Sequence, residues 1–193
     1  KKGEPVEGDL VVVIGGRTGR DGIHGATFSS GEMTDRTMSV NSSAVQIGHP
    51  IEEKRMSDAL LLARDRGLIR AITDCGAGGF SSSLGEMGKN IGVDVWLDKV
   101  PLKYPGLAPW EIWQSESQER MVVAVKPENL ESLVEICKDH NVEATVIGKF
   151  TGNRRLKVYY GKEIVCDLDM EFLYNGLPQR IMAASWKPET FKE

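Results

Sequence analysis

The stretch RMVVAVKPENLESLVEICKDHNVEATVIGKFT, residues 120–151, decides the fold class. Its apolar run at 120–125 is rich in β-branched residues and predicts a buried strand. Pro127 then opens a segment in which Leu130, Leu133 and Cys137 recur at helical spacing. A second β-branched run follows at 142–151. The order strand, helix, strand indicates an α+β arrangement in which the helix packs on a sheet.

The rest of the chain extends this pattern in both directions. Residues 154–169, RRLKVYYGKEIVCDLD, predict a hairpin that turns at YGKE, residues 160–163. Upstream, the sequence predicts strands at 9–14, 68–75 and 91–102, helices at 49–67 and 80–90, and a helical turn at 109–114. The expected fold is α+β, a mixed β-sheet layered with α-helices.

Composition limits the classes of protein to be considered. The chain has 193 residues, of which 40% are hydrophobic, enough for one sizeable domain. A net charge of −4 disfavours a general nucleic-acid or membrane-surface binder, and no apolar run is long enough to span a bilayer. Cys75, Cys137 and Cys166 lie far apart and form no CxxC pair. They are therefore expected to be reduced thiols of a cytoplasmic protein.

Both ends of the chain look like connecting segments. The first residues, KKGEPVEGD, lack a methionine, and the last, ASWKPETFKE, are polar and contain proline. We expect a domain of a longer protein, with a linker at 1–7, the domain itself at 8–178 and a C-terminal tail at 179–193.

The first candidate site is the loop GGRTGRDGIHG, residues 15–25, which follows the first strand. Its glycines let backbone N–H groups approach an anion, and Arg17 and Arg20 could add charge-assisted hydrogen bonds. With the Ser- and Thr-rich residues 27–43 it forms a long polar loop region. The alternative is a mobile connector whose arginines are solvated.

The second candidate is TDCGAGGFSSS, residues 73–83. An aspartate ends a strand, a turn containing Gly76, Gly78 and Gly79 follows, and a helix begins. Asp74 could hold Mg²⁺ while backbone N–H groups of the turn hold phosphate oxygens. The GK[ST] ending of a P-loop is absent. The alternative is that Asp74 merely caps the turn.

The third candidate is SESQER, residues 115–120, a polar cluster at the entrance of a strand. Polar clusters on a rigid scaffold are frequent ligand-binding positions. Glu116 and Gln118 could hydrogen-bond to an amide or a sugar hydroxyl. The alternative is a solvated turn.

Taken in order, several segments resemble the synthetase of the phosphoribosylformylglycinamidine synthase family. They are GGRTGRDGIHGATFSS, AVQIGHPIEEKRM, TDCGAGGFSSSLGEMG, LDKVPL and PWEIWQSESQERM, between about residues 8 and 125. The pair GATFSS and SESQERM separates this family from selenophosphate synthetase and thiamine-phosphate kinase, its relatives in the AIR synthetase-like superfamily. The resemblance is to the AIR synthetase C-terminal-like domain.

The resemblance implies a reaction. Such enzymes use ATP and Mg²⁺ to activate the formamide oxygen of formylglycinamide ribonucleotide, and ammonia from a glutaminase then displaces phosphate to give the amidine. The implied partners are an upstream AIR synthetase N-terminal-like domain and the glutaminase. The upstream domain would hold the catalytic histidine and most ATP contacts, so no catalytic residue is expected in this chain.

The resemblance also assigns residues by position. Gln46 and the tripeptide Glu116, Ser117 and Gln118 match substrate-binding positions, and Asp74 matches a Mg²⁺ ligand. His49 departs from the family, in which aspartate is common at this position. Two rivals stay open: a non-catalytic regulatory domain that binds a nucleotide, and another ATP-using member of the superfamily such as selenophosphate synthetase.

Overall fold

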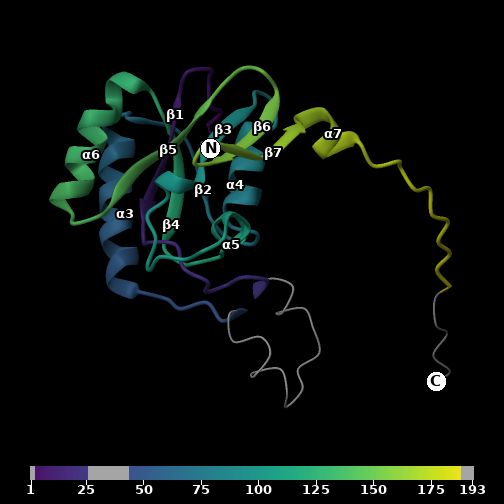
Figure 1. The fold of residues 1–193 in the computed structure, drawn as a ribbon, viewed down its shortest axis with the longest axis horizontal. Coiled ribbons are helices and arrows are strands. Elements are labelled where there is room, and N and C mark those ends of the chain that lie inside the picture. Colours follow the sequence, from purple (N-terminus) through teal and green to yellow (C-terminus); the bar gives the residue numbers. More distant parts are fainter. Residues whose placement is uncertain (1–2, 26–43, 188–193) are drawn as a thin grey trace, which may run out of the picture.

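A computed structural model describes residues 3–25 and 44–187, so the predicted polar loop at 27–43 lies outside the described residues. The described chain forms one seven-stranded sheet in the order β2-β4-β1-β5-β3-β6-β7 (Figure 1). All neighbouring strands are antiparallel except β3 and β6, which are parallel. The strands are β1 (Leu10–Gly15), β2 (Ile69–Asp74), β3 (Val93–Trp96), β4 (Arg120–Val125), β5 (Ala144–Phe150), β6 (Arg155–Tyr160) and β7 (Glu163–Asp169).

Helices cover both faces of the sheet. α3 (Pro50–Asp65) and α6 (Leu130–Asp139) pack side by side on one face, and α4 (Phe80–Gly88) and α5 (Pro109–Gln114) lie on the other (Figure 1). The alternation of β1 explains this layering. Val11 and Val13 belong to the core beneath α4 and α5, whereas Val12 and Ile14 belong to the core beneath α3 and α6. The predicted α+β class with a mixed sheet is therefore confirmed.

Two expected elements differ in extent. The strand expected at 91–102 is too long, because β3 ends at Trp96 and a 3₁₀ turn, η2 (Leu97–Lys99), follows. Pro101 disfavours a helical conformation at Val100, which is extended, so the 3₁₀ turn ends at Lys99. The helical segment expected to open at Pro127 begins as a 3₁₀ turn, η3 (Pro127–Asn129), before α6. The hairpin predicted at 154–169 is confirmed, with β6 and β7 joined through Gly161 at φ +60°.

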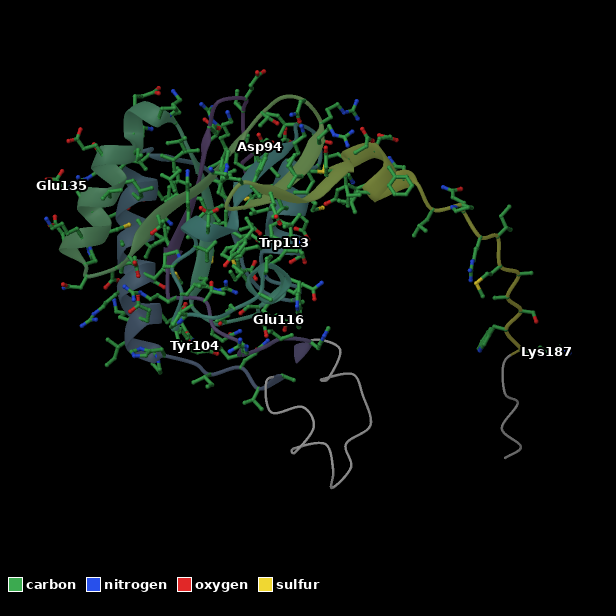
Figure 2. The ribbon with its side chains drawn as sticks, viewed as in Figure 1. Asp94, Tyr104, Trp113, Glu116, Glu135 and Lys187 are labelled. Carbon is green, nitrogen blue, oxygen red and sulfur yellow. The ribbon has the colours of Figure 1, made fainter. Side chains whose placement is uncertain are left out.

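Strand direction brings the three candidate loops to one end of the sheet. Because β4 runs antiparallel to both neighbours, Gly15 at the end of β1 lies opposite Arg120, and Asp74 at the end of β2 lies opposite Met121. The loops after β1 and β2 and the turn before β4 therefore meet. Glu116 lies at this end of the molecule, whereas Glu135 projects from the outer face of α6 (Figure 2).

The C-terminal part leaves the sheet. A short helix, α7 (Met170–Asn175), follows β7, and the chain then extends away from the domain (Figure 1). No helix within 3–25 and 44–187 has the length and apolar character needed to cross a membrane.

Candidate functional site

The turn before β4 is the centre of the candidate site. Ser115, Glu116, Ser117 and Arg120 are all buried, with at most 3% of their surface exposed. The solvated-turn interpretation of SESQER is therefore wrong. Glu119 adopts φ +55°, a left-handed conformation that is uncommon for a residue with a side chain. The turn is thus a packed structure with one strained position.

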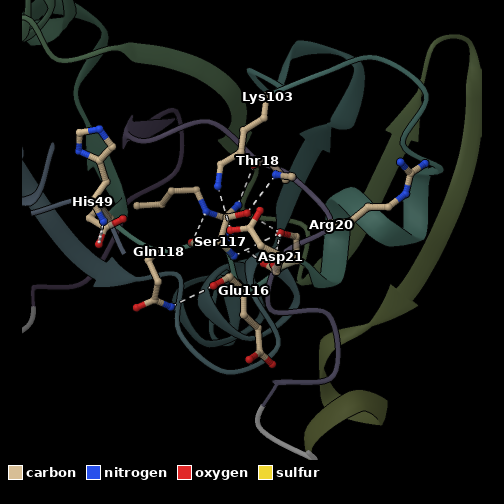
Figure 3. Close-up of polar contacts among 12 residues, drawn as sticks. Thr18, Arg20, Asp21, His49, Lys103, Glu116, Ser117 and Gln118 are labelled. Carbon is tan, nitrogen blue, oxygen red and sulfur yellow. Dashed lines mark hydrogen bonds and ion pairs between the residues drawn. The ribbon is translucent and has the colours of Figure 1, made fainter. Parts of the chain in front are cut away.

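The carboxylate of Glu116 joins two other segments to this turn. Its Oε1 accepts a hydrogen bond of 3.0 Å from the N–H of Gly78, and its Oε2 accepts one of 2.9 Å from Nε2 of Gln46. Gln118 donates from Nε2 to the main-chain oxygen of Glu116 at 3.0 Å (Figure 3). The structure therefore brings Gln46, Glu116 and Gln118, the three predicted substrate-binding residues with long polar side chains, into one hydrogen-bonded cluster.

Ser117 faces the protein interior. Its Oγ accepts a 2.9 Å hydrogen bond from the N–H of Gly19 and lies 3.0 Å from Oγ of Ser115. Ser115 Oγ in turn donates to the main-chain oxygen of Asp21 at 3.3 Å. The two serines therefore fasten the glycine-rich loop after β1 to the turn before β4.

Asp74 stands apart from this cluster. Its carboxylate is exposed and accepts no hydrogen bond from the described residues, which contradicts the interpretation that it merely caps the turn. Together with Gly76, Gln118, Glu119 and others it lines a pocket of about 200 Å³. Within the described residues, the N–H groups of Gly76 and Ala77 also have no acceptor. The pocket wall thus includes the free carboxylate of Asp74, the free amide of Gly76 and the side chain of Gln118, together with the acidic residues Glu53 and Glu119.

The glycine turn after β2 has the conformation that its sequence predicts. Gly78 and Gly79 adopt φ +76° and +56°. A Cβ at Gly79 would collide with the main-chain oxygen of Ser115, so the turn packs directly on the SESQER segment. No group of three His, Cys, Asp or Glu residues that could hold a metal exists in the described part of the chain.

The arginines of the first loop bind protein groups. Arg17 forms an exposed 2.8 Å ion pair with Glu143. Arg20 donates from Nε to Glu111 at 2.8 Å and lies over the ring of Tyr104, away from Glu116 and Gln118 (Figure 3). The hydrogen bond from Arg20 is the main reason that the pKa of Glu111 is lowered.

The loop itself is packed against the protein. Thr18 and Ile23 are 1% and 5% exposed, and Thr18 pairs with Leu102 in an isolated bridge. The described part of this loop is therefore no solvated connector.

His49 has a local role at the start of α3. Its Nδ1 accepts a 3.2 Å hydrogen bond from the N–H of Glu52, and its own N–H donates to Oε1 of Glu119 at 2.9 Å (Figure 3). An aspartate side chain at this position would cap the helix in the same way.

Sequence reasoning included Thr18, Ser115 and Arg120 in the candidate segments but assigned no role to any of them. Arg120 carried a signal: it is a charged residue placed directly before five apolar residues of a predicted strand. Its side chain is almost completely buried and hydrogen-bonds to both of the other two.

The fold and the order of its motifs match a known family of domains. The family model described as "AIR synthase related protein, C-terminal domain" matches residues 6–161, and the chain belongs to this family. The structure of the hydrogenase maturation protein HypE of E. coli is more distantly similar. It matches with a TM-score of 0.59 and 17% identity, over 85% of this chain and 51% of that one. At this identity the likeness shows the fold alone.

Closer relatives share one name. The chain is 46% identical over 168 residues to "Phosphoribosylformylglycinamidine synthase subunit PurL" of Thermoplasma acidophilum, covering 86% of this chain and 22% of the relative. The protein of the same name from Methanopyrus kandleri is 40% identical over 186 residues, covering 95% and 25%. The structure of T. maritima PurL complexed with FGAR matches with a TM-score of 0.86 and 34% identity, over 100% of this chain and 32% of that one. The chain thus spans about a quarter of the length of the curated relatives it matches.

Proposed function

We propose that this chain is the substrate-binding domain of an ATP-dependent ligase that converts formylglycinamide ribonucleotide to its amidine. The observation that carries the proposal is the meeting of Gln46, Glu116 and Gln118 with the Gly76–Gly79 turn at one end of the sheet. Its support is the similarity to PurL, including a PurL complexed with FGAR.

In this proposal the chain holds the ribonucleotide while ATP activates its formamide oxygen and ammonia from glutamine displaces phosphate, leaving ADP. Solved PurL structures with ATP and in a PurLQS assembly support ATP use and a glutaminase partner. The free amides of Gly76 and Ala77 are suited to bind phosphate oxygens, and the amides of Gln46 and Gln118 to bind the substrate. Most ATP contacts and the catalytic histidine would come from an upstream domain. The cytoplasmic location and the boundaries at 7/8 and 178/179 stay predictions.

Asp74 fits one part of a Mg²⁺ site. Its carboxylate is exposed on the same pocket as Gly76 and is not engaged by the described residues. Mg²⁺ commonly uses one or two carboxylates and takes its other ligands from water and substrate phosphates, so a lone aspartate suffices here. Bound there, Mg²⁺ would neutralise phosphate charge during phosphoryl transfer.

The experiment uses the full-length protein with ATP, the ribonucleotide and either glutamine with the glutaminase or ammonia. We expect ATP-dependent amidine formation. Asp74→Asn should raise the Mg²⁺ concentration needed for half-maximal activity by about tenfold or more, as loss of a direct ligand predicts. Asp58→Asn, which alters an exposed ion pair on α3, is the matched control.

Nucleotide binding without amidine formation would favour a regulatory domain. Selenophosphate formation would favour another ATP-using enzyme of the superfamily, selenophosphate synthetase. Either result would overturn the proposal. Unchanged Mg²⁺ dependence in Asp74→Asn would remove Asp74 from the metal site while leaving the ligase assignment in place.

A further inference from the structure

Arg120 is a buried cation that forms no ion pair with the described residues, although the negative charge of Asp21 favours its protonated form. It is 3% exposed, and its guanidinium lies 4.8 Å over the ring of Phe80 at the start of α4. Burial lowers the pKa of the guanidinium from its ordinary value, although an arginine stays protonated at neutral pH. A buried charge that forms no ion pair is costly unless its hydrogen bonds are satisfied, so the hydrogen bonds of Arg120 are important.

The contacts of Arg120 all go to neutral oxygens of the site loops. Nε donates to the main-chain oxygen of Ser117 at 2.8 Å, and Nη2 donates to the main-chain oxygen of Ser115 at 2.5 Å. Nη1 donates to Oγ1 of Thr18 in the loop after β1 at 2.8 Å. The guanidinium thus has the five-donor fork that can hold two carbonyl groups of one turn and a third group from another loop at the same time.

These hydrogen bonds fix the direction in which the side chain of Glu116 points, because Glu116 lies between Ser115 and Ser117. Ser115 and Ser117 both turn their main-chain oxygens toward Arg120, and between them the side chain of Glu116 reaches Gly78 and Gln46. The strained φ of Glu119 closes the turn next to Arg120. Arg120 is also one of the residues that line the pocket beside Asp74 and Gln118.

We propose that Arg120 is a positioning residue that clamps the 115–117 turn to the loop after β1 and so presents Gln118, Gln46 and the glycine turn to the ribonucleotide. The part that concerns substrate rests on the proposed function, whereas the clamp itself does not. Lysine cannot replace the fork, because a single ammonium lacks its planar geometry.

The clamp is tested by hydrogen exchange of the full-length protein without ligand. In Arg120→Lys, the hydrogen-bonded amides within 15–22 and those of Gly78 and Gly79 should exchange at least about tenfold faster, equivalent to about 1.4 kcal/mol of local opening. Peptides from β5 and α6 should keep their wild-type rates. Thr18→Val, which removes one acceptor and keeps the shape, should show the same pattern more weakly. Arg155→Lys is the matched control, since Arg155 also begins a strand but forms an exposed ion pair with Asp167.

The link to substrate is tested by steady-state kinetics on the same variants. We expect KM for the ribonucleotide to rise by about tenfold in Arg120→Lys, equivalent to about 1.4 kcal/mol, while KM for ATP changes less than about twofold. Added guanidine should partly restore the wild-type KM of Arg120→Ala, which a merely destabilised protein would not show.

The exchange, KM and activity measurements test the clamp, the role toward substrate and the proposed function, respectively. Unchanged exchange at 15–22 and at Gly78 and Gly79, or faster exchange spread evenly over the protein, would overturn the clamp. Faster local exchange with an unchanged KM for the ribonucleotide would overturn the role toward substrate. A wild-type protein that forms no amidine would overturn the proposed function, and the exchange data would still decide the clamp.

Discussion

Glu116 illustrates at the scale of a residue how a carboxylate can be both charged and structural. Its two oxygens accept from the main chain of one loop and the side chain of another, and only 3% of the residue is exposed. Removing such an acceptor leaves a buried donor unsatisfied, which costs more than the hydrogen bond itself contributes.

We therefore expect Glu116→Ala to lower the free energy of unfolding by about 1–3 kcal/mol, because the N–H of Gly78 loses its acceptor. Glu116→Gln keeps the shape and an acceptor, so its loss should be below about 1 kcal/mol. Urea unfolding measures both. Glu135→Ala on the exposed face of α6 serves as the control and should stay within about 0.5 kcal/mol of wild type. Equal losses for the alanine and glutamine variants of Glu116 would contradict this account.

Cys137 gives a pH-dependent prediction at the same scale. Burial beneath α6 raises the pKa of its thiol from 9.0 to about 11. Below pH 9 both states keep the proton. Above pH 9 the unfolded chain loses the proton first, so the folded state becomes less stable as pH rises toward 11.

Between pH 8 and 10 this thiol should lower the free energy of unfolding by about 1.4 kcal/mol. The pH dependence in Cys137→Ala should be shallower by this amount, measured by urea unfolding under reducing conditions. From pH 6 to 8 the two curves should run parallel, which is the internal control. Parallel curves up to pH 10 would show that the Cys137 thiol ionises as easily in the folded protein as in the unfolded chain.

At the scale of elements, the contact between the start of α4 and the turn before β4 decides the geometry of the site. Gly79 is the N-cap of α4, with φ +56° and ψ −129°, a conformation that is essentially restricted to glycine. Its missing side chain allows the main chain to touch Ser115. A glycine here serves close packing as well as backbone freedom.

Gly79→Ala should therefore lower stability by more than about 3 kcal/mol, since it adds both a collision and a forbidden conformation. Gly67→Ala is the matched control. Gly67 follows α3 at φ +69° with nothing within 4 Å of an added Cβ, so only about 1 kcal/mol should be lost. Thermal or urea unfolding measures the difference. Similar losses in the two variants would mean that the packing against Ser115 contributes little.

At the scale of the whole molecule, the antiparallel strands place three loops, far apart in the sequence, at one end of the sheet. These loops supply backbone amides, the exposed carboxylate of Asp74 and glutamine side chains. Under the proposed function, an upstream domain would add most ATP contacts and the catalytic histidine to this surface.

The isolated chain should accordingly show no amidine formation with ATP, the ribonucleotide and ammonia, although it should fold. The reason is that the proposed ATP contacts and catalytic histidine lie outside it. Product formation followed by chromatography measures this, with the full-length protein as the positive control. Turnover above the rate without protein would overturn the division of labour proposed here.

The amino-acid sequence by itself determined the elements and the three polar segments. A continuous apolar run marks β1, and apolar periodicity marks α3 and α6, because each element buries its apolar residues against a core and this requirement is local. The ordered motifs also identified the family, which the match at 6–161 confirms. The end of β3 at Trp96 was not predicted, because the alternating pattern continues through a 3₁₀ turn.

Only the tertiary structure decided how the three segments act on one another. That Glu116 binds Gly78 and Gln46, and that Arg120 holds Ser115, Ser117 and Thr18, depends on strand order and side-chain direction. The partners in these hydrogen bonds lie up to 102 residues apart. Local propensities contain no information about pairing at such separations, whereas the packing of β1, β2 and β4 fixes it.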